Sequence, residues 1–408
     1  MKSLTSLTSK IKRNKFTFFS WFLFLVTRLL ILKLPPLYYS DVSHDYERYA
    51  NMWWYGLTPY LEHYYEYPPA TIPLLLAPLW LDQKGLGFYY QNYRTIIFGL
   101  EFFLFSLIVK TLKNRSLKAK YLSIIFYCLI GLVAKDFWYE GLGLVFIGSY
   151  LAAILFLLKG KDIKNSITTW FFFWLSFGIK FMTLPLFPAL FASIKNKFRN
   201  KLLPIIIGGV IVWGVPIIIF RSSLLVSVVF HLNRPAKYGS FPSHLADFAN
   251  HFTQSETRTT KPPDYQLEGP ISAQLENIFG PVFYIGIVVI ALISFIHITK
   301  RKNPDLKSLL KYSLIYILFI FLSGKTFSSP FYIWLIPLLA IFPFKTTKNQ
   351  SLVFLLTLYM IILDTTSLIS LPPTPVLGPV TLKLLRDSTR FIPMFILLAF
   401  FSTIKDKK

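Results

Sequence analysis

The stretch from Phe16 to Leu37 reads FTFFSWFLFLVTRLLILKLPPL and decides how the rest of the chain is understood. It follows the basic segment MKSLTSLTSKIKRNK, residues 1–15. An apolar stretch of this length exceeds the ~7–15 residues of a signal-peptide core, and it lacks a small-residue cleavage site. It is long enough to cross a bilayer, for which a helix needs about 20 mostly apolar residues. We therefore expect a retained first transmembrane helix rather than a cleaved leader.

Apolar runs of this kind recur along the whole chain. Of its 408 residues, 54% are hydrophobic and 15% are charged, and the mean hydropathy is +0.52. Ordinary soluble domains carry about 25% charged residues. We therefore expect an all-α, polytopic membrane protein, a single domain over 1–408 with about 12 (roughly 11–13) transmembrane helices. The candidate spans lie near residues 16–38, 67–82, 91–110, 119–135, 141–158, 166–180, 181–195, 202–220, 281–299, 308–323, 330–344, 350–370 and 388–404.

The formal net charge of +24 is distributed in short Lys and Arg clusters between the apolar runs. The positive-inside rule produces that arrangement, because cytoplasmic loops retain Lys and Arg. We therefore interpret the charge as topology and expect no nucleic-acid partner. The segments without such clusters are expected outside, above all a first loop at 39–66 and a long polar loop at 221–280.

One segment does not fit this assignment. If 67–82 and 91–110 both cross the membrane, the basic cluster at 110–120 lies on the outer side, against the positive-inside rule. Either the short segment 67–82, which contains Pro73 and Pro78, is re-entrant, or one crossing is miscounted.

The first outer loop combines carboxylates, histidines and an arginine with many tyrosines and tryptophans. If its beginning is helical, Asp41, Asp45 and Tyr49 share one face at i, i+4 spacing, and Arg48 stands beside Asp45 at i+3. That face would direct two carboxylates into a cavity near the membrane surface. An interfacial helix, whose aromatic residues form a belt and whose charges are solvated, explains the same pattern.

Three further stretches on the same predicted side carry cationic and hydrogen-bonding groups. Lys180 lies at the turn of a short helical hairpin, and Lys325 and Ser328 stand at the entrance of a helix. His231, Arg234, Lys237 and Ser240 directly follow a span. Together such groups bind a phosphate, with help from helix N-terminal amides. Taken singly, a Lys or Arg at such a place is more often a snorkelling or solvated residue.

Several short motifs occur together: SDV at 40–42, EYPP at 66–69, HLNRP at 231–235, and GKTFSS at 324–329 leading into YIWLIPLL at 332–339. In this combination the chain, from about residue 20 to 345, resembles glycosyltransferase family eighty-seven. The resemblance implies an integral membrane enzyme of the GT-C fold that uses polyprenyl-phosphate sugars, as the mannosyltransferases of the family do. EYPP and the Lys-to-Trp stretch carry most of the likeness.

The resemblance also implies an aspartate of the first outer loop as catalytic base, commonly followed by a tyrosine four residues later. Asp41 has the SDV context, but Tyr46 follows it at five residues. Asp45 has Tyr49 at four residues but lacks the context. The base therefore stays open between Asp41 and Asp45, with Asp41 slightly favoured.

The expected reaction is an inverting transfer of a sugar, mannose by resemblance, to a lipid or glycan acceptor. A lipid phosphate leaves as a stable anion, so one carboxylate as base and cations that hold the phosphate suffice. Arg48, Tyr49 and Glu66 are expected to position the loop or the acceptor, and no metal or other cofactor is expected. The site would face the extracytoplasmic side of the cell membrane, or the lumen if the membrane is that of the endoplasmic reticulum.

A transporter or flippase of lipid-linked sugars is the alternative. Such proteins place ionisable residues inside spans, where a charge costs at least ~2.5–3.5 kcal/mol and so marks a pathway. Glu101, His297 and Asp364 are the candidates. No internal repeat is visible, which argues against the commonest transporter architecture. A membrane scaffold without chemistry is a third reading, and it predicts that the loop carboxylates tolerate substitution.

Overall fold

The computed structural model describes residues 2–34, 41–160, 162–195, 198–233, 237, 239–255, 257–259, 266–301, 305–367 and 389–404. Within these ranges the fold is predominantly α-helical, as expected. The exception is a short antiparallel hairpin of β1 (Thr257–Thr259) and β2 (Gln266–Glu268).

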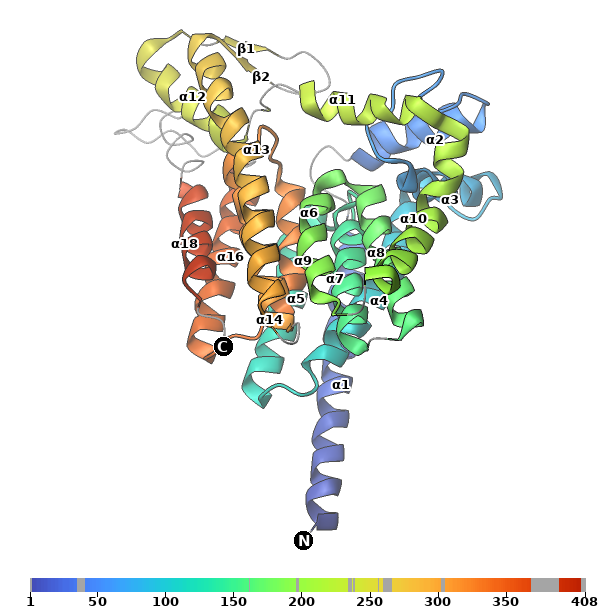
Figure 1. Ribbon diagram of the computed structural model, residues 1–408, viewed down its shortest axis with the longest axis vertical. Helices are drawn as coiled ribbons and strands as arrows, with labels where there is room; N and C mark the ends of the chain where they lie inside the picture. Colours follow the sequence, from blue (N-terminus) through green and yellow to red (C-terminus); the bar gives the residue numbers. More distant parts are fainter. Residues whose placement is uncertain are drawn as a thin grey trace.

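The longer helices form an upright bundle (Figure 1). In chain order they are α1 (Lys2–Lys33), α4 (Tyr89–Leu112), α5 (Leu117–Val133), α7 (Gly143–Lys159), α8 (Ile163–Ile179), α10 (Phe198–Phe220), α13 (Pro270–Thr299), α14 (Leu306–Ser323), α16 (Thr347–Ser367) and α18 (Phe391–Thr403).

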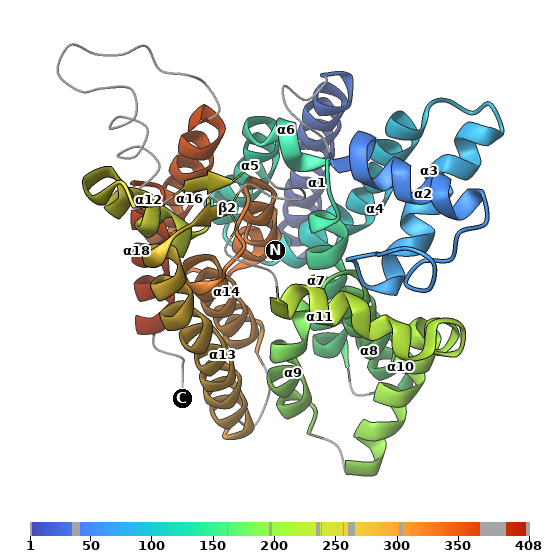
Figure 2. The same ribbon diagram turned by 90° about the horizontal axis from the view of Figure 1, so that it is seen from above.

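Shorter helices connect them. They are η1 (Val42–Tyr46), α2 (Glu47–Trp54), η2 (Pro69–Thr71), α3 (Ile72–Gln83), α6 (Lys135–Trp138), η3 (Phe181–Leu186), α9 (Phe187–Ser193), η4 (Arg221–Leu224), α11 (Leu225–Asn233), α12 (Phe241–Thr253), η5 (Ser329–Trp334) and α15 (Ile336–Ile341). Figure 1 shows α2, α3, α11, α12 and the hairpin at one end of the bundle, which we call the loop end, while the N-terminus projects from the other end. Viewed along the bundle, α2 and α3 lie on one side of the loop end and α12 with the hairpin on the other (Figure 2).

Five segments are long and apolar enough to cross a membrane by length and composition: Lys15–Lys33, Tyr89–Leu112, Lys201–Leu232, Pro270–Thr299 and Leu306–Ser323. Four shorter apolar helical segments accompany them, at Gly143–Lys159, Phe181–Ser193, Ser329–Ile341 and Phe391–Thr403. These lengths and compositions are those of a helical membrane protein.

The structure places the segment 67–82 at the loop end. Helix α3 has 12 residues and packs against α2 and α4 (Figure 1). Of the two alternatives, this position favours a segment that does not cross the membrane on its own. The turn from α4 to α5, near 113–116, then lies at the end of the bundle from which the N-terminus projects.

The expected long polar loop at 221–280 is more ordered than its composition suggests. It begins with η4, α11 and α12, and α13 starts at Pro270 rather than near residue 281. Part of the loop, 260–265, lies outside the described residues. Its helices cover the loop end instead of leaving it open.

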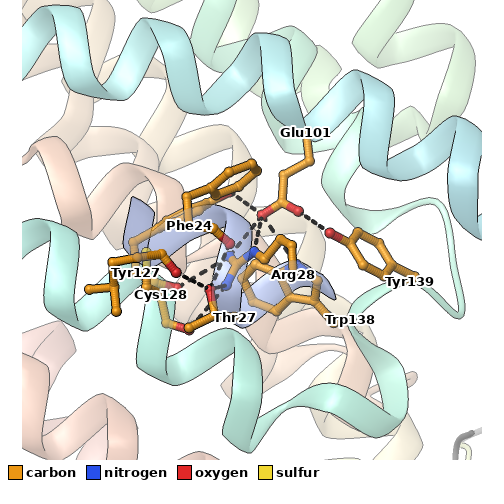
Figure 3. A network of polar contacts seen from close by, with 9 residues as sticks. Phe24, Thr27, Arg28, Glu101, Tyr127, Cys128, Trp138 and Tyr139 are labelled. Carbon is orange, nitrogen blue, oxygen red and sulfur yellow. Dashed lines mark hydrogen bonds and ion pairs between the residues drawn. The ribbon is translucent and has the colours of Figure 1, made fainter. Parts of the chain in front are cut away.

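Glu101, one of the candidates for a transport pathway, is bound to an arginine of the first helix (Figure 3). Nε and Nη2 of Arg28 donate to Glu101 Oε1 at 3.0 and 2.8 Å. The same carboxylate accepts hydrogen bonds from Tyr127 at 2.8 Å, Trp138 Nε1 at 3.2 Å and Tyr139 at 2.5 Å. Both charged side chains are fully buried. A buried ion pair needs such complete hydrogen bonding to offset its desolvation, so Glu101 joins α1, α4, α5 and α6 structurally.

Basic side chains also cap the C-terminal carbonyls of neighbouring helices. Arg115 donates to the end of α15 at 3.0 Å, Lys195 to the end of α13 at 3.1–3.2 Å, and Lys311 to the residue that follows α18 at 2.7 Å. The last four carbonyls of a helix have no partner within the helix and carry its negative partial charge. Several Lys and Arg residues counted above as topology signals therefore also connect helices.

Candidate functional site

A cavity of about 640 Å³ lies among the segments of the loop end. Its lining comes from the first loop, the turn before α7, the α8–η3 turn, α11 and Lys237 after it, the middle of α13, and the adjoining ends of α14 and η5. We call its carboxylates, Asp41, Asp45 and Glu66, the acidic wall. We call its basic side chains, Lys180, His231, Lys237 and Lys325, the basic wall. Apolar and aromatic side chains complete the lining, among them Phe181, Met182, Phe283, Tyr284, Ile320, Phe327, Phe331 and Trp334.

Most of the predicted site residues meet in this cavity, although they are far apart in the sequence. Those that line it are Asp41, Asp45, Glu66, Lys180, His231, Lys325 and Ser328. Arg48 and Tyr49 do not line it. Arg234 lies outside the described residues. The lining also includes Tyr46 and Tyr67, which the sequence did not single out as site residues, and Lys237, a cationic residue of the same stretch as His231.

Arg48 and Tyr49 contact other residues of the first loop on the side away from the cavity. Arg48 forms an ion pair with Asp45 at 3.2 Å, and its side chain is 60% exposed. The ring of Tyr49 is buried and stacks on Trp53 and His63. The expectation that Tyr49 shares one helix face with the two aspartates is therefore wrong, because the aspartates line the cavity and Tyr49 does not.

A turn of π-helix at 42–46 explains the change of face. The backbone N–H of Glu47 bonds to the carbonyl of Val42, an i→i+5 pairing, whereas an α-helix pairs i with i+4. In an α-helix the residue four positions after Asp41 would lie on the same face, one turn further along. In a π-helical turn the residue five positions after Asp41 takes that position instead. That residue is Tyr46, which lines the cavity together with Asp41. Helices of this kind are rare and occur frequently at functional sites.

Buried phenols surround Asp41. Burial raises the pKa of Tyr46 well above its ordinary value of 10.0, and the charges of Tyr93 and Asp41 add to the effect. Burial likewise raises the pKa of Tyr67, with further contributions from Tyr46, Glu66 and Asp41. Tyr46 and Tyr67 are hydrogen-bonded to each other and pack edge to face at 5.6 Å. Both phenols therefore stay protonated beside the carboxylates at neutral pH.

The first loop is held together largely by its own side chains. The indole of Trp53 donates to Nε2 of His63 at 2.7 Å, and because an indole N–H is only a donor, the proton of this imidazole lies on Nδ1, which donates to the carbonyl of Tyr64 at 2.9 Å. Tyr60 donates to the carbonyl of Tyr67 at 2.5 Å. The acidic wall thus stands on a compact aromatic unit.

Lys180 follows the last residue of α8 in an extended conformation, with φ −148° and ψ 128°. Its Nζ lies 5.4 Å from the ring centre of Phe331, 5.5 Å from that of Trp334 and 6.0 Å from that of Tyr67. Aromatic faces attract a cation at this distance. The ammonium group is therefore held at the cavity, next to a tyrosine that also neighbours the acidic wall.

Lys237 and Lys325 are brought together by the backbone. The N–H of Lys237 donates to the carbonyl of Lys325 at 2.8 Å. Two residues further on, Gly239 has φ +97°, a conformation that favours glycine, and its carbonyl accepts a hydrogen bond from Arg390 at 2.5 Å. Lys237 stands in the stretch that also contains His231, so the sequence offered a signal for it, but its contact with Lys325 is purely tertiary.

The other two transport candidates also have neighbours within the bundle. Arg390 binds Asp364 at 2.6 Å, with both side chains largely buried. The imidazole of His297 packs edge to face against Tyr312 at 5.6 Å. In the described part of the chain, Glu101 and Asp364 thus join helices as ion pairs.

The described residues contain no group of three or more His, Cys, Asp or Glu side chains arranged to hold a metal ion. In comparisons with known proteins, no family model, no curated protein and no solved structure matches this chain. The geometry of the cavity is therefore the basis for assigning a function.

Proposed function

We propose that this protein is a membrane glycosyltransferase that moves a sugar from a polyprenyl-phosphate donor to a lipid or glycan acceptor. The observation that carries the proposal is the single cavity that brings the acidic wall and the basic wall together with apolar and aromatic side chains. The acidic wall suits an acceptor hydroxyl, the basic wall suits an anionic phosphate, and the apolar and aromatic side chains suit a hydrophobic lipid chain.

The proposed architecture is a GT-C fold of the family eighty-seven kind. Twelve helical passes among the described residues fit this proposal: α1, α4, α5, α7, α8, η3 with α9, α10, α13, α14, η5 with α15, α16 and α18. With the basic clusters on the cytoplasmic side, the loop end faces the extracytoplasmic side of the cell membrane. The donor would then reach the cavity from that leaflet.

Asp41 is the proposed general base. In the reaction, the acceptor oxygen attacks the anomeric carbon as the bond from that carbon to the phosphate oxygen breaks, and the carboxylate takes the acceptor proton. The electron pair of the broken bond leaves with the polyprenyl phosphate, and the configuration inverts. Two features support Asp41 over Asp45: the π-helical turn brings Tyr46 one turn after Asp41, and Asp45 is engaged by Arg48.

The basic wall would hold the phosphate before and after transfer. Charge-assisted hydrogen bonds to phosphate are roughly twice as strong as neutral ones, and preorganised cations stabilise the negative charge that develops on the leaving group. Lys180, Lys237 and Lys325 are the proposed contacts, with Ser328 as an additional hydroxyl. Phe283 and Ile320, which also line the cavity, would contact the first isoprene units.

The experiment uses the full-length protein in lipid nanodiscs with a panel of radiolabelled polyprenyl-phosphate sugars and a lipid extract as the source of acceptors. Sugar transfer that persists in EDTA is the expected result. Loss of transfer in EDTA with recovery in Mg²⁺ or Mn²⁺ would show that the carboxylates serve a metal ion instead. Liposome-reconstituted protein that moves the labelled lipid between leaflets without transferring its sugar would support the flippase alternative and overturn the proposal.

A further inference from the structure

Arg94 of α4 is a second buried arginine that reaches the first helix. Its Nη2 donates to the carbonyl of Ile31 at 2.7 Å and to that of Leu34 at 3.3 Å, while Nη1 donates to Leu32 at 3.3 Å. The residue is 4% exposed. The carbonyls at a helix C-terminus lack partners within the helix, so one planar guanidinium fixes the end of α1 in position and in orientation.

The same guanidinium is paired with Glu140. Nε of Arg94 lies 3.2 Å from Glu140 Oε1, and both side chains are almost fully buried. Tyr90 donates to that oxygen at 2.8 Å, and its ring lies 5.2 Å from the guanidinium carbon. The pair thus joins α1 and α4 to the turn between α6 and α7.

Both partners are adjacent in the chain to segments that flank the candidate base. Leu34, at the end of α1, is separated from Asp41 by the segment 35–40, which lies outside the described residues. On the other side, Glu140 precedes Gly141, which lines the cavity, and a Cβ on Gly141 would stand 3.9 Å from the hydroxyl of Tyr46. Tyr46 also packs against Tyr93, next to Arg94 in the chain, at 5.5 Å.

The second buried ion pair, of Arg28 and Glu101, has a different location from the pair of Arg94 and Glu140. It joins the same two helices two turns further into the bundle, because Glu101 follows Arg94 by seven residues on α4. Its partners are all in the interior of the bundle (Figure 3). Consecutive residues Tyr139 and Glu140 connect the two pairs, since Tyr139 donates to Glu101. Only the pair with Arg94 reaches the cavity lining.

We infer that the ion pair of Arg94 and Glu140 is a positioning device for Asp41. It fixes the end of α1, from which the segment with Asp41 starts, relative to the Gly141 turn, against which Tyr46 rests. This inference rests on the proposed function in that it takes Asp41 as the reacting carboxylate. A buried ion pair is by itself weak evidence of stabilisation, because apolar residues of similar volume can often replace both partners together without loss. The orientation of three carbonyls, in contrast, requires the planar donors of an arginine.

The test compares Arg94→Met, Arg94→Lys and Glu140→Gln with the wild type. Arg115→Met is the matched control, because Arg115 also caps a neighbouring helix but lies between α4 and α5, away from the cavity lining. The readouts are kcat and KM for sugar transfer and the amide hydrogen exchange of peptides covering 42–54, with α8 as internal reference.

For Arg94→Met we expect kcat to fall by about 100-fold, the loss that a misplacement near 1 Å causes, with KM for the donor within about twofold. Amide exchange at 42–54 is expected to rise while α8 keeps its protection. Arg94→Lys should recover part of the rate, and Arg115→Met should leave both readouts unchanged.

Unchanged kcat and exchange in Arg94→Met would overturn the inference, and so would an equal loss of rate in Arg115→Met. If Arg94→Met does not fold, Arg94→Lys and Glu140→Gln carry the same comparison. If the wild type transfers no sugar, the proposed function fails, and the exchange of 42–54 alone decides whether the pair positions this segment.

Discussion

The acidic wall and the basic wall of the cavity are built in opposite ways. The acidic wall comes from one continuous segment, 41–67, in which buried tyrosines, a tryptophan and a histidine pack on one another. The basic wall consists of side chains from three separate segments, at 180, at 231 and 237, and at 325. Because the first loop packs on itself, it can hold a reacting carboxylate in a fixed position. The positions of the basic side chains depend instead on how the separate segments that carry them pack against one another.

Asp41→Asn is expected to have the largest effect, because the amide keeps the shape of the side chain but cannot take a proton. A general base contributes about 10²–10⁴-fold, so kcat should fall by about 10³-fold with little change in donor affinity. Asp45→Asn is the matched control and should lose less than about tenfold, since Asp45 pairs with Arg48. Steady-state transfer kinetics measure both. Comparable losses in the two variants would contradict the assignment, and normal turnover in both and in the double variant would eliminate the carboxylates as base.

Lys180→Met is expected to weaken donor binding rather than the chemical step. A hydrogen bond to a charged group contributes about 1.5–3 kcal/mol, which corresponds to roughly 10- to 100-fold in affinity. The apolar methionine should still fit among Phe331, Trp334 and Tyr67. Lys84→Met, an exposed position at the end of α3, serves as the control. Equal affinities of wild type and Lys180→Met in equilibrium binding of a non-hydrolysable donor analogue would remove Lys180 from the site.

Tyr65→Phe tests whether the acidic wall is a cooperative unit. Thr71 donates its hydroxyl proton to Pro68 at 2.6 Å, so the buried hydroxyl of Tyr65 donates to Thr71, also at 2.6 Å. Losing that bond should lower the free energy of unfolding by about 1 kcal/mol. Tyr55→Phe, at a side chain that is 80% exposed, should leave the melting temperature unchanged, and so should Lys325→Met on the basic wall. A drop in the melting temperature of all three variants would mean that the acidic wall and the basic wall contribute alike to stability, which contradicts the comparison.

Glu62→Gln should have the smallest effect, confined to a surface turn. The backbone N–H of Thr58 donates to Glu62 at 2.5 Å, and this bond lowers the pKa of the carboxyl below its ordinary value of 4.5. Because the folded pKa is below the unfolded one, the contribution is present above the unfolded pKa and is lost as the pH falls through the folded pKa. Amide exchange at Thr58 should therefore be faster in Glu62→Gln than in the wild type at pH 7, and the difference should shrink in acid and vanish once the pH lies below the lowered pKa of the folded state. A difference that persists in acid would point to another cause.

Much of the fold followed from local properties of the chain. Hydropathy alone predicts the helical, membrane-type architecture, and Lys180 lies at the predicted turn between two helices. Whether 67–82 crosses the membrane stayed open in the sequence, because apolar composition does not reveal that α3 has 12 residues and packs on α2 and α4 at the loop end (Figure 1). The predicted helix face of Tyr49 was also wrong, because a rule of i, i+4 spacing cannot anticipate a π-helical turn.

The sequence by itself determined which segments are apolar, where the basic clusters lie, and that one polar, aromatic loop follows the first helix, because these are properties of contiguous residues. Only the tertiary structure decided that Arg28 meets Glu101, that Arg94 reaches the end of α1, and that Lys237 contacts Lys325. Hydropathy and helical periodicity describe one element at a time, whereas these contacts join residues 63 to 88 positions apart. Two of them involve buried arginines, whose charges require a partner that no local pattern identifies.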